Sequence, residues 1–398
     1  MPAKESLSGS SMPGWLKLIA VTTAIGPIAI DLYLPAFPAI EAGFHERGVE
    51  RTLAFYLLGL AIGQLFYGPI SDRFGRKPPL YVGFTLFCIG ALGCALAWNM
   101  NVLILCRVVQ AIGACSGMAI GRAVVRDRCE PEDAARAFSM LMTIVAIAPI
   151  VAPIAGGFMV TSLGWRAAFV VQALMGAGVL IAMHFVMTES LPPEHVQPLR
   201  LRRVLSAYWG LFKDRSFVVH SLISSFGFGA MITYISGAPI VLTQTYHIAP
   251  SQFGWIIGMN GIAFMLSSRL NMRALRKHKP VALIGRYIVR PSVVGALLVA
   301  VSLWSGAPLW AVMLLQFAFF FSTACIMPNA SALALTHQAR NAGTASALMG
   351  GLQSVISMLM GLLLATINNG TLAPLAFLMA GSVLICLLLY RWNRSASE

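Results

Sequence analysis

Two charged residues stand inside long apolar stretches of the chain, where ionisable side chains are rare. Of fourteen acidic residues, only Asp31 lies deep in such a stretch, one turn after the Gly26-Pro27 break, and Arg107 lies at a similar depth in another stretch. A charge at that depth costs about 2.5–3.5 kcal/mol on insertion scales. We expect Asp31 to bind and release a proton with Arg107 as its neighbouring partner. The alternative is a buried ion pair kept only for packing specificity.

The stretches around these residues are long enough to cross a bilayer. Hydrophobic residues make up 58% of the chain, charged residues only 11%, and the mean hydropathy is +0.78, whereas about a quarter of a soluble domain is charged. About 20 apolar residues cross ~30 Å of hydrocarbon as a helix, and lipid-exposed backbone must satisfy its own hydrogen bonds. We predict twelve helical spans, at residues 15–37, 52–71, 79–98, 101–121, 138–160, 165–187, 217–241, 251–270, 281–304, 308–331, 343–367 and 371–391.

The longest internal loop divides these spans into two groups of six. It runs from Glu189 to Asp214 and contains three prolines followed by a basic run. We therefore predict an all-α membrane protein of two pseudo-symmetric six-helix bundles, residues 1–188 and 215–398, joined by a cytoplasmic linker, residues 189–214. The N-terminal residues lack the charged region and cleavage site of a secretory signal, so we expect span one to stay in the mature protein.

The net charge of +14 is explained by topology. If the N-terminus is cytoplasmic, 23 of the 28 Lys and Arg residues fall on the cytoplasmic side, in loops, tails or the cytoplasmic ends of spans. Arg47, Arg51 and Arg166 fall outside, and Arg107 and Arg290 lie within spans. This is the positive-inside bias, and it places both termini in the cytoplasm. The basic residues therefore do not indicate a nucleic-acid partner.

Enzyme, metal and nucleotide sites have no signal in the sequence. There is no Gly-Lys dipeptide for a Walker A lysine, and neither G-x-G-x-x-G nor G-x-S-x-G occurs. The seven cysteines and seven histidines do not have the spacing of a metal site. We expect a carrier without catalytic residues, metal or cofactor, driven by an ion gradient.

Other polar and aromatic residues inside the spans are candidates for the lining of a mostly apolar cavity, which suits hydrophobic or amphipathic substrates. For each one, an interhelical hydrogen bond or ordinary packing is the competing explanation. The candidates are Tyr33, Tyr56, Gln64, Gln110, Phe228, Tyr234, Asn260, Gln316, Phe320 and Gln353.

A signature follows span two, in the sequence from Gly68 to Pro78, GPISDRFGRKP. It closes one helix and opens the next at the cytoplasmic face, and Gly75 allows a tight turn. The segment resembles the loop 2-3 motif of the major facilitator superfamily at nearly every position. The resemblance implies a conformational latch made by Gly68, Asp72, Arg73, Gly75 and Arg76 with two acids at the ends of spans four and six, Asp127 and Glu189.

In that resemblance each charged residue of the latch has a role. Asp72 is expected to face the start of span eleven near Ala342, where a helix N-terminus favours a carboxylate. Arg73 is expected to pair with Asp127 and Glu189. Such a latch would stabilise the outward-facing state.

Two further segments resemble motifs of the same superfamily. In span four, the stretch from Leu103 through Arg107 and Gln110 resembles a motif whose arginine is associated with proton transfer, while Gly113, Gly117 and Gly121 favour helix packing. In span five, Pro149, Pro153, Gly156 and Gly157 resemble an antiporter motif, with alanine where glycine is common. The two prolines predict a bend in the helix.

The whole chain resembles the Bcr/CflA drug-resistance subfamily, through residues 31–38 (DLYLPAFP), 328–330 (PNA) and 342–348 (AGTASAL). The resemblance implies a multi-pass carrier of the bacterial inner membrane that exports drugs in exchange for protons by alternating access. We expect small-molecule drugs, protons and bilayer lipid as partners, and a monomer. The alternatives are export of a metabolite, peptide or siderophore, or a membrane sensor that keeps the carrier fold without transport.

Overall fold

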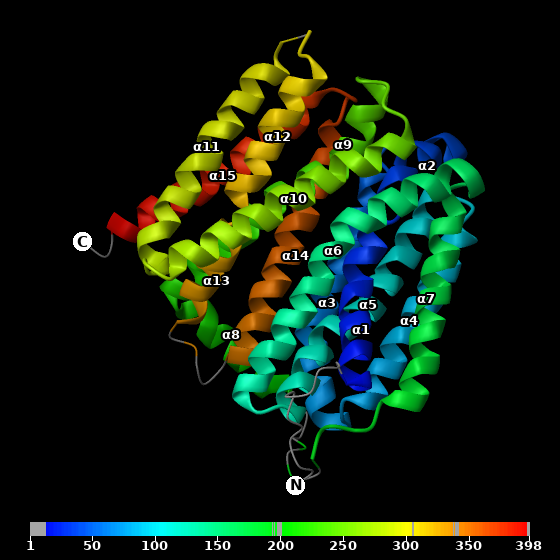
Figure 1. Ribbon diagram of the computed structural model, residues 1–398, viewed down its shortest axis with the longest axis vertical. Helices are drawn as coiled ribbons and strands as arrows, with labels where there is room; N and C mark the ends of the chain where they lie inside the picture. Colours follow the sequence, from blue (N-terminus) through cyan, green and yellow to red (C-terminus); the bar gives the residue numbers. More distant parts are fainter. Residues whose placement is uncertain are drawn as a thin grey trace.

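The structure is a computed structural model, and it describes residues 13–192, 194, 196, 201–304, 306–336, 338 and 342–395. In these residues all regular elements are helices (Figure 1). In chain order they are α1 Gly14–Asp31, the 3-10 helix η1 Leu34–Ala36, α2 Phe37–Phe44, α3 Glu50–Phe74, α4 Lys77–Ala95, α5 Met100–Arg128, α6 Pro131–Leu163, α7 Trp165–Val186, α8 Leu201–Lys213, α9 Arg215–Gln244, α10 Pro250–Leu275, α11 Pro280–Ser302, α12 Leu309–Thr323, α13 Ile326–Leu335, α14 Ala342–Ile367 and α15 Leu372–Ser395.

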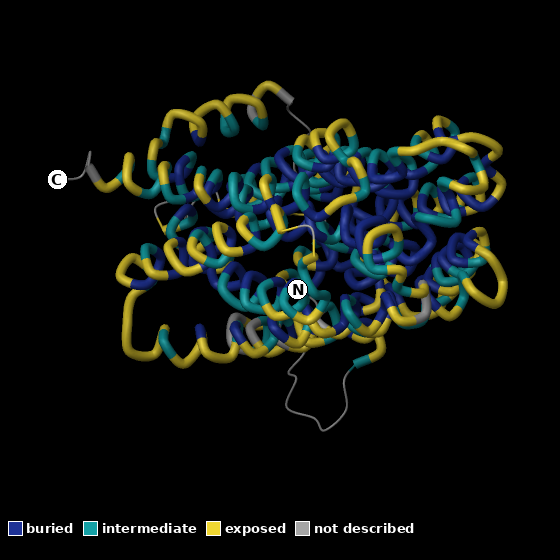
Figure 2. Tube along the Cα trace, turned by 90° about the horizontal axis from the view of Figure 1, so that it is seen from above, coloured by how far each residue is buried: buried dark blue, intermediate teal, exposed yellow. Residues whose placement is uncertain are grey.

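Eleven helical segments of the described chain are long and apolar enough to cross a membrane. They correspond to eleven of the twelve predicted spans, and the first of them continues from Gly14 to Phe44 through η1 and α2. The remaining predicted span, 251–270, is α10, a 26-residue helix with a larger share of polar side chains. Large apolar side chains such as Phe158 and Trp255 are exposed. Figure 2 shows exposed residues along the outer turns of the helices, a surface suited to lipid.

Small residues bring α1, α3 and α4 close to α5. A methyl group added at Gly117 of α5 would overlap the Thr22 carbonyl oxygen of α1, and one at Gly59 of α3 would lie 2.5 Å from the Val108 carbonyl oxygen. Gly113 faces the backbone of α4 just as tightly. The prediction that the glycines of span four serve helix packing is confirmed.

Two pairs of helices join the first part of the chain to the second. α3 packs along α14, and α6 packs against α10. A methyl group at Gly254 of α10 would lie 2.6 Å from the Ile154 Cα atom of α6, so these backbones nearly touch. From that contact α10 runs away from α6 across the molecule (Figure 1). Smaller contacts between the two parts are made by α2 and η1 with α9, and by η1 with α10.

The connection between the two parts is only partly described, because residues 193, 195 and 197–200 lie outside the described residues. Within it, α8 packs against α9 and α14. The Tyr208 hydroxyl of α8 donates to the Leu65 carbonyl oxygen of α3 at 3.1 Å. The division of the chain into two bundles with a cytoplasmic linker stays a prediction.

Candidate functional site

Arg107 of α5 is enclosed by aromatic rings. Its guanidinium carbon lies 4.0 Å from the ring centroids of both Tyr33 and Tyr56, and its side chain is 0% exposed. One terminal nitrogen donates to the Ala29 carbonyl oxygen at 3.2 Å and to Gln110 Oε1 at 2.7 Å. A cation–π contact with a desolvated arginine is worth about 2 kcal/mol. The two rings therefore supply much of the stabilisation that the sequence analysis assigned to a carboxylate.

The predicted contact between Asp31 and Arg107 is wrong. Neither a hydrogen bond nor an ion pair joins them among the residues that the structure describes. Arg107 reaches α1 at Ala29, so the two groups do lie at a similar depth. Asp31 is two residues further along, which is about 200° around a helix. The carboxylate therefore points to a different side of α1.

Asp31 is the last residue of α1, and the chain continues from it toward η1. Its side chain is 5% exposed, and in the described part of the chain its carboxylate has no hydrogen bond or ion pair. The next residue, Leu32, packs on α6, because a methyl group at Gly156 would overlap the Leu32 carbonyl oxygen. η1 also contacts α9 and α10. Asp31 thus stands where α1, α6 and the second part of the chain meet.

The proline and glycine segment of α6 forms this junction. Pro149 and Pro153 lie inside α6, and Gly156 and Gly157 are buried. A methyl group at Gly254 would lie 2.7 Å from the Pro153 carbonyl oxygen, so α10 packs on the same segment that Leu32 contacts from the other side. The structure therefore places Pro153 against α10 and Gly156 against the residue that follows α1. The role of the four residues as a hinge stays a prediction.

Three predicted cavity residues belong to the cluster around Arg107. Tyr33, Tyr56 and Gln110 are all 0% exposed, so in this conformation they support the arginine and do not border open space. The Gln110 amide donates to Gln172 Oε1 at 2.6 Å, and the Tyr33 hydroxyl shares a hydrogen bond with Thr52 at 3.0 Å. Sequence reasoning missed Gln172 and Thr52, although Gln172 was detectable as a polar residue inside an apolar span.

A second group of predicted cavity residues gathers on α9, α10 and α12. Tyr234 and Phe320 form an edge-to-face pair with centroids 5.3 Å apart. Gln316 lies one turn before Phe320, and both of its amide atoms are buried without a hydrogen-bond partner. The amide nitrogen of Asn260 on α10 is also buried and unpaired. Buried amides normally find a partner, so these groups are available to a ligand or to water.

The remaining predicted cavity residues have structural contacts. Gln64 of α3 donates to Ser354 of α14 at 3.4 Å, which links the two parts of the chain. Gln353 donates to the Ser224 hydroxyl of α9 at 2.8 Å. Phe228 is partly buried against the large hydrophobic core. Both glutamines therefore make interhelical hydrogen bonds, which was the competing explanation for polar residues inside the spans.

In the segment from Gly68 to Pro78, the ion pair with Asp127 is made by Arg76. Arg76 Nε donates to Asp127 Oδ2 at 2.8 Å, and one Nη donates to Asp72 Oδ1 at 2.6 Å and to the Ser71 hydroxyl at 2.9 Å. The Arg76 side chain is 2% exposed. Burial alone would lower the pKa of Arg76, but the bonds to Asp127 and Asp72 raise it above its ordinary value. Arg76 is therefore a charged centre that joins the ends of α3 and α5.

Glu189 binds backbone and not an arginine side chain. Its carboxylate accepts from the backbone nitrogens of Arg76 at 2.8 Å and Lys77 at 3.0 Å, at the start of α4, and from Ser190 and Leu191 at 2.9 Å. Burial by itself would raise the pKa of Glu189, but these four donors lower it below its ordinary value. A carboxylate at a helix N-terminus is favourable, so Glu189 holds the end of α7 against the start of α4.

The predicted pairing of Arg73 with Asp127 and Glu189 is therefore wrong. Arg73 is exposed in the last turn of α3, whereas Gly75, at φ +87°, turns the chain so that Arg76 points inward. A side chain at Gly75 would also meet the Glu189 carboxylate.

The expected latch to span eleven is also not formed in this conformation. Within the described residues, no hydrogen bond or ion pair joins Asp72 to α14, and the Asp72 side chain is 45% exposed. An added methyl group at Gly68 would meet no atom within 4 Å. The contact that would stabilise the outward-facing state is therefore absent from this part of the structure.

Glu50 is a second buried acid, although from the sequence only Asp31 was expected to lie deep in an apolar stretch. At the start of α3 it is 0% exposed, and it accepts a hydrogen bond from the Asn368 amide that follows α14. Its other carboxylate oxygen has no partner. Both residues line a cavity of about 550 Å³ between the two parts of the chain. No sequence signal separates Glu50 from the exposed acids near it, because its burial comes from packing against the second part.

Comparison with known proteins identifies the fold and the family. Residues 19–360 match the profile of the Major Facilitator Superfamily. The MFS-type transporter YdgK of Bacillus subtilis is 32% identical, with 91% of this chain and 90% of the relative covered. The bicyclomycin resistance protein homolog of Haemophilus influenzae is 29% identical with 94% of each chain covered, and multidrug resistance protein D of Escherichia coli is 27% identical with 93% and 94% covered.

Solved structures agree on the fold. A D-xylose-proton symporter superposes with a TM-score of 0.77 at 14% identity over 95% of this chain and 96% of its own. A bacterial homolog of the lysosomal transporter Spinster, in an inward-facing and unoccupied conformation, superposes with a TM-score of 0.72 at 16% identity over 98% of each chain. With its helical architecture, its membrane-spanning segments and the family match over most of its length, the chain is a transporter that belongs to the Major Facilitator Superfamily.

Proposed function

We propose that this transporter exports hydrophobic or amphipathic drugs across the cytoplasmic membrane in exchange for protons. The names of two relatives that match almost the whole chain, a bicyclomycin resistance protein homolog and multidrug resistance protein D, support drug export. The position of Asp31 is the observation that supports the proposed proton coupling.

Asp31 is suited to proton exchange because it is an acid without a counter-ion among the residues that the structure describes. Arg107 is already engaged by two rings, the Ala29 carbonyl and Gln110. Asp31 is therefore left to change charge by binding a proton. A buried neutral carboxyl costs much less than a buried carboxylate, so a change of environment around Asp31 shifts its proton occupancy.

The surroundings of Asp31 connect that occupancy to helix movement. Leu32, its neighbour, packs on Gly156 of α6, and α10 packs on Pro153 from the other side. In alternating access by rocking of two halves, the contact between α6 and α10 must change. Proton and drug would then favour opposite conformations of one carrier, which gives coupling by linkage.

Proton flux in energised inverted membrane vesicles tests this proposal. Addition of a drug should cause alkalinisation of the acidified lumen for the wild-type chain, because each drug molecule enters in exchange for protons. Asp31→Asn should insert and bind drug but give no proton flux. Glu46→Gln, at a half-exposed acid paired with Arg51, is the control and should resemble wild type. Drug binding without proton flux by the wild-type chain would indicate a sensor, and wild-type flux by Asp31→Asn would remove Asp31 from the mechanism.

A further inference from the structure

α8 is an amphipathic helix with an exposed apolar face, and nothing in the proposed transport cycle uses it. Leu205, Trp209 and Phe212 are spaced four and three residues apart, so they lie on one side of the helix. They are 65%, 65% and 45% exposed. We refer to these three residues as the apolar face of α8. Exposure of so many apolar atoms to water is unfavourable, so the apolar face needs a partner.

The side of α8 that packs on the protein is a different one. Tyr208 and Leu211 join an apolar cluster with residues of α9 and α14, and Leu211 is 3% exposed. The Tyr208 hydroxyl also donates to the Leu65 carbonyl oxygen of α3 at 3.1 Å. Trp209 and Phe212 each follow a packed residue by one position, so the apolar face is turned by about 100° from the packed side. Packing within the described chain therefore leaves the apolar face uncovered.

α8 lies at the boundary of the membrane. It ends at Lys213, and the membrane-spanning helix α9 begins two residues later at Arg215. Figure 1 shows α8 at the lower end of the molecule, below α13. Trp392 of α15 lies at the same level, because its carbonyl oxygen accepts from Arg215 Nη2 at 3.0 Å, and it is 56% exposed. Tryptophans gather at membrane–water interfaces, so Trp209 and Trp392 mark the level of the bilayer surface.

Basic residues border the apolar face. Residues 200–215 include five Lys or Arg residues and one acid, Asp214, whose carboxylate oxygens already accept two hydrogen bonds. Arg202 precedes Trp209 by seven residues, so it lies on the same side of the helix. Lys213 follows Trp209 by four residues, and its Nζ atom lies 6.0 Å from the Trp209 ring centroid. Both cations are exposed. An apolar face bordered by cations is typical of helices that lie on anionic membranes.

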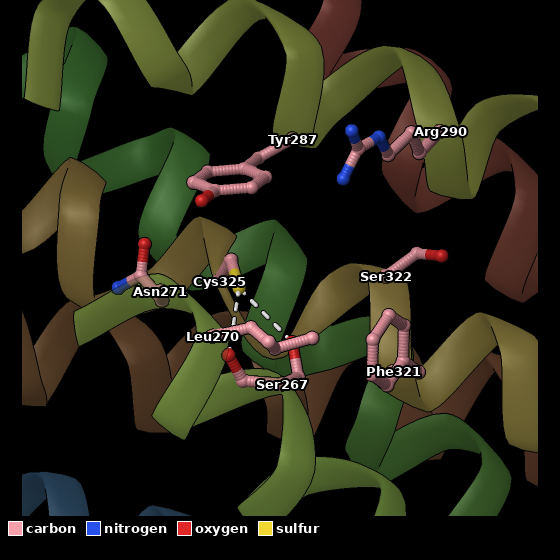
Figure 3. Close-up of a pocket in the computed structure, with 8 residues that line it drawn as sticks. All are labelled: Ser267, Leu270, Asn271, Tyr287, Arg290, Phe321, Ser322 and Cys325. Atoms are coloured by element: carbon pink, nitrogen blue, oxygen red, sulfur yellow. Dashed lines mark hydrogen bonds between the residues drawn. The ribbon is translucent and has the colours of Figure 1, made fainter. Parts of the chain in front are cut away.

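The cavity beside Arg290 of α11 does not offer a headgroup site of this kind. Arg290 is the eleventh of the 23 residues of α11, so its Cα atom lies about 15 Å from the start of the helix, near the middle of the span. Phospholipid headgroups lie outside the hydrocarbon core and do not reach that depth. Figure 3 shows Arg290 and Asn271 at opposite ends of the Tyr287 ring, so their polar groups do not converge on one ligand. The cations beside α8 are at the depth of the headgroups, whereas Arg290 is not.

We propose that α8 lies in the membrane surface and binds anionic phospholipid headgroups through Arg202 and Lys213, with its apolar face among the acyl chains. The partner is a phospholipid and not a protein, because apolar side chains and cations stand together at the level where acyl chains and phosphates meet. Each cation can form a charge-assisted bond to a phosphate. Since Tyr208 bonds to α3 and α8 packs on α14, this binding anchors the connection between the two parts of the chain to the bilayer. The inference depends on neither drug export nor proton coupling.

Native mass spectrometry of the purified full-length protein in a neutral maltoside detergent tests the headgroup contacts. Wild type should bind dioleoylphosphatidylglycerol more tightly than dioleoylphosphatidylcholine, which has the same acyl chains without a net charge. The double variant Arg202→Gln/Lys213→Gln should weaken binding of the first phosphatidylglycerol molecule by about thirtyfold, the effect of two surface cations. Arg276→Gln/Lys277→Gln removes two exposed cations between α10 and α11, and this matched control should bind like wild type. Equal weakening by the two double variants, or equal binding of the two lipids by wild type, would overturn the proposal.

A nitroxide label on α8, in nanodiscs that contain phosphatidylglycerol, tests the insertion of the apolar face. In Leu205→Cys the label should be more accessible to oxygen, which concentrates among acyl chains, than to a water-soluble nickel chelate. In Gly210→Cys the order should reverse, because this position is about 140° around the helix and an added methyl group there meets no atom within 4 Å. Labelled wild type gives the background, since none of its cysteines is exposed. Access of the nickel chelate to both labels would place α8 in water and overturn the proposal. Protection of the Leu205→Cys label from both reagents would indicate a protein partner or a second copy of the chain, and would overturn it as well.

Discussion

Replacement of Arg76 by alanine should destabilise the protein far more than the same replacement of Arg73. Both arginines belong to one short segment, but Arg76 is 2% exposed with three hydrogen bonds, whereas Arg73 is exposed. Removal of one member of a buried ion pair costs about 3–5 kcal/mol, because the other member keeps its charge without compensation.

The structure places the effect at the lower end of this range. Asp72, one of the two partners, is 45% exposed and can be solvated once Arg76 is gone, while Asp127 is 11% exposed and cannot. We therefore expect a loss of about 3 kcal/mol for Arg76→Ala, which is roughly 6–12 °C in melting temperature for a unit of 150–250 residues. Arg73→Ala should change the stability by less than about 0.5 kcal/mol.

Thermal unfolding of the purified variants measures this difference. The buried cysteines, among them Cys129 two positions after Asp127, provide the signal, because a thiol-reactive fluorophore reaches them only on unfolding. Asp127→Asn in the Arg76→Ala background should restore part of the loss, because the remaining buried charge is removed. Equal shifts for the two alanine variants, or no restoration by Asp127→Asn, would refute the assignment of the pair to Arg76.

Three further perturbations have expected outcomes. Because the pKa of Glu189 lies below its ordinary value of 4.5, its stabilisation is present above about pH 4.5 and is lost as the pH falls through the folded-state pKa. Glu189→Gln should therefore lower the melting temperature at pH 7 and flatten the fall of the melting temperature at acidic pH. Parallel curves of melting temperature against pH for wild type and variant would contradict this. Gly156→Ala should lower the free energy of unfolding by about 1–3 kcal/mol, because its methyl group would overlap a carbonyl oxygen. Gly178→Ala, whose methyl group would meet no atom within 4 Å, should unfold like wild type. Equal melting temperatures for the two variants would show that α1 and α6 are not so close. Glu50→Gln keeps an acceptor for the Asn368 amide and should change stability by less than about 1 kcal/mol, whereas Glu50→Ala should lower it by about 2 kcal/mol. Both effects are measured by thermal unfolding. A smaller effect of Glu50→Ala than of Glu50→Gln would exclude the hydrogen bond between Glu50 and Asn368.

The helical spans of this protein could be predicted from the sequence alone. A segment of about 20 apolar residues has to be a helix in a bilayer whatever its neighbours are, because its backbone must bond to itself. Only α10 departs from the pattern, since its additional polar residues are buried by other helices: Asn260 and Asn271 are 5% and 4% exposed. Its membrane position follows from packing beside α6 and α12.

The depth of a residue is also contained in the sequence, but the direction of its side chain is not. Counting residues from the ends of two spans placed Asp31 and Arg107 at one level, and the bond from Arg107 to Ala29 agrees with that level. Which side of α1 faces α5 depends on close packing at Gly117, which meets the Thr22 carbonyl group of α1. Arg107 consequently meets two tyrosine rings and a carbonyl oxygen, and Asp31 faces elsewhere.

The choice between Arg73 and Arg76 and the burial of Glu50 were decided by tertiary structure for the same reason. Three positions separate the two arginines, and the left-handed turn at Gly75 decides which of them points inward. Glu50 is covered by a residue more than three hundred positions away, Asn368. The sequence thus determined the spans and the depth of their charged residues, because hydrophobicity and helical rise act locally, while the pairing of those charges required the packing of distant helices.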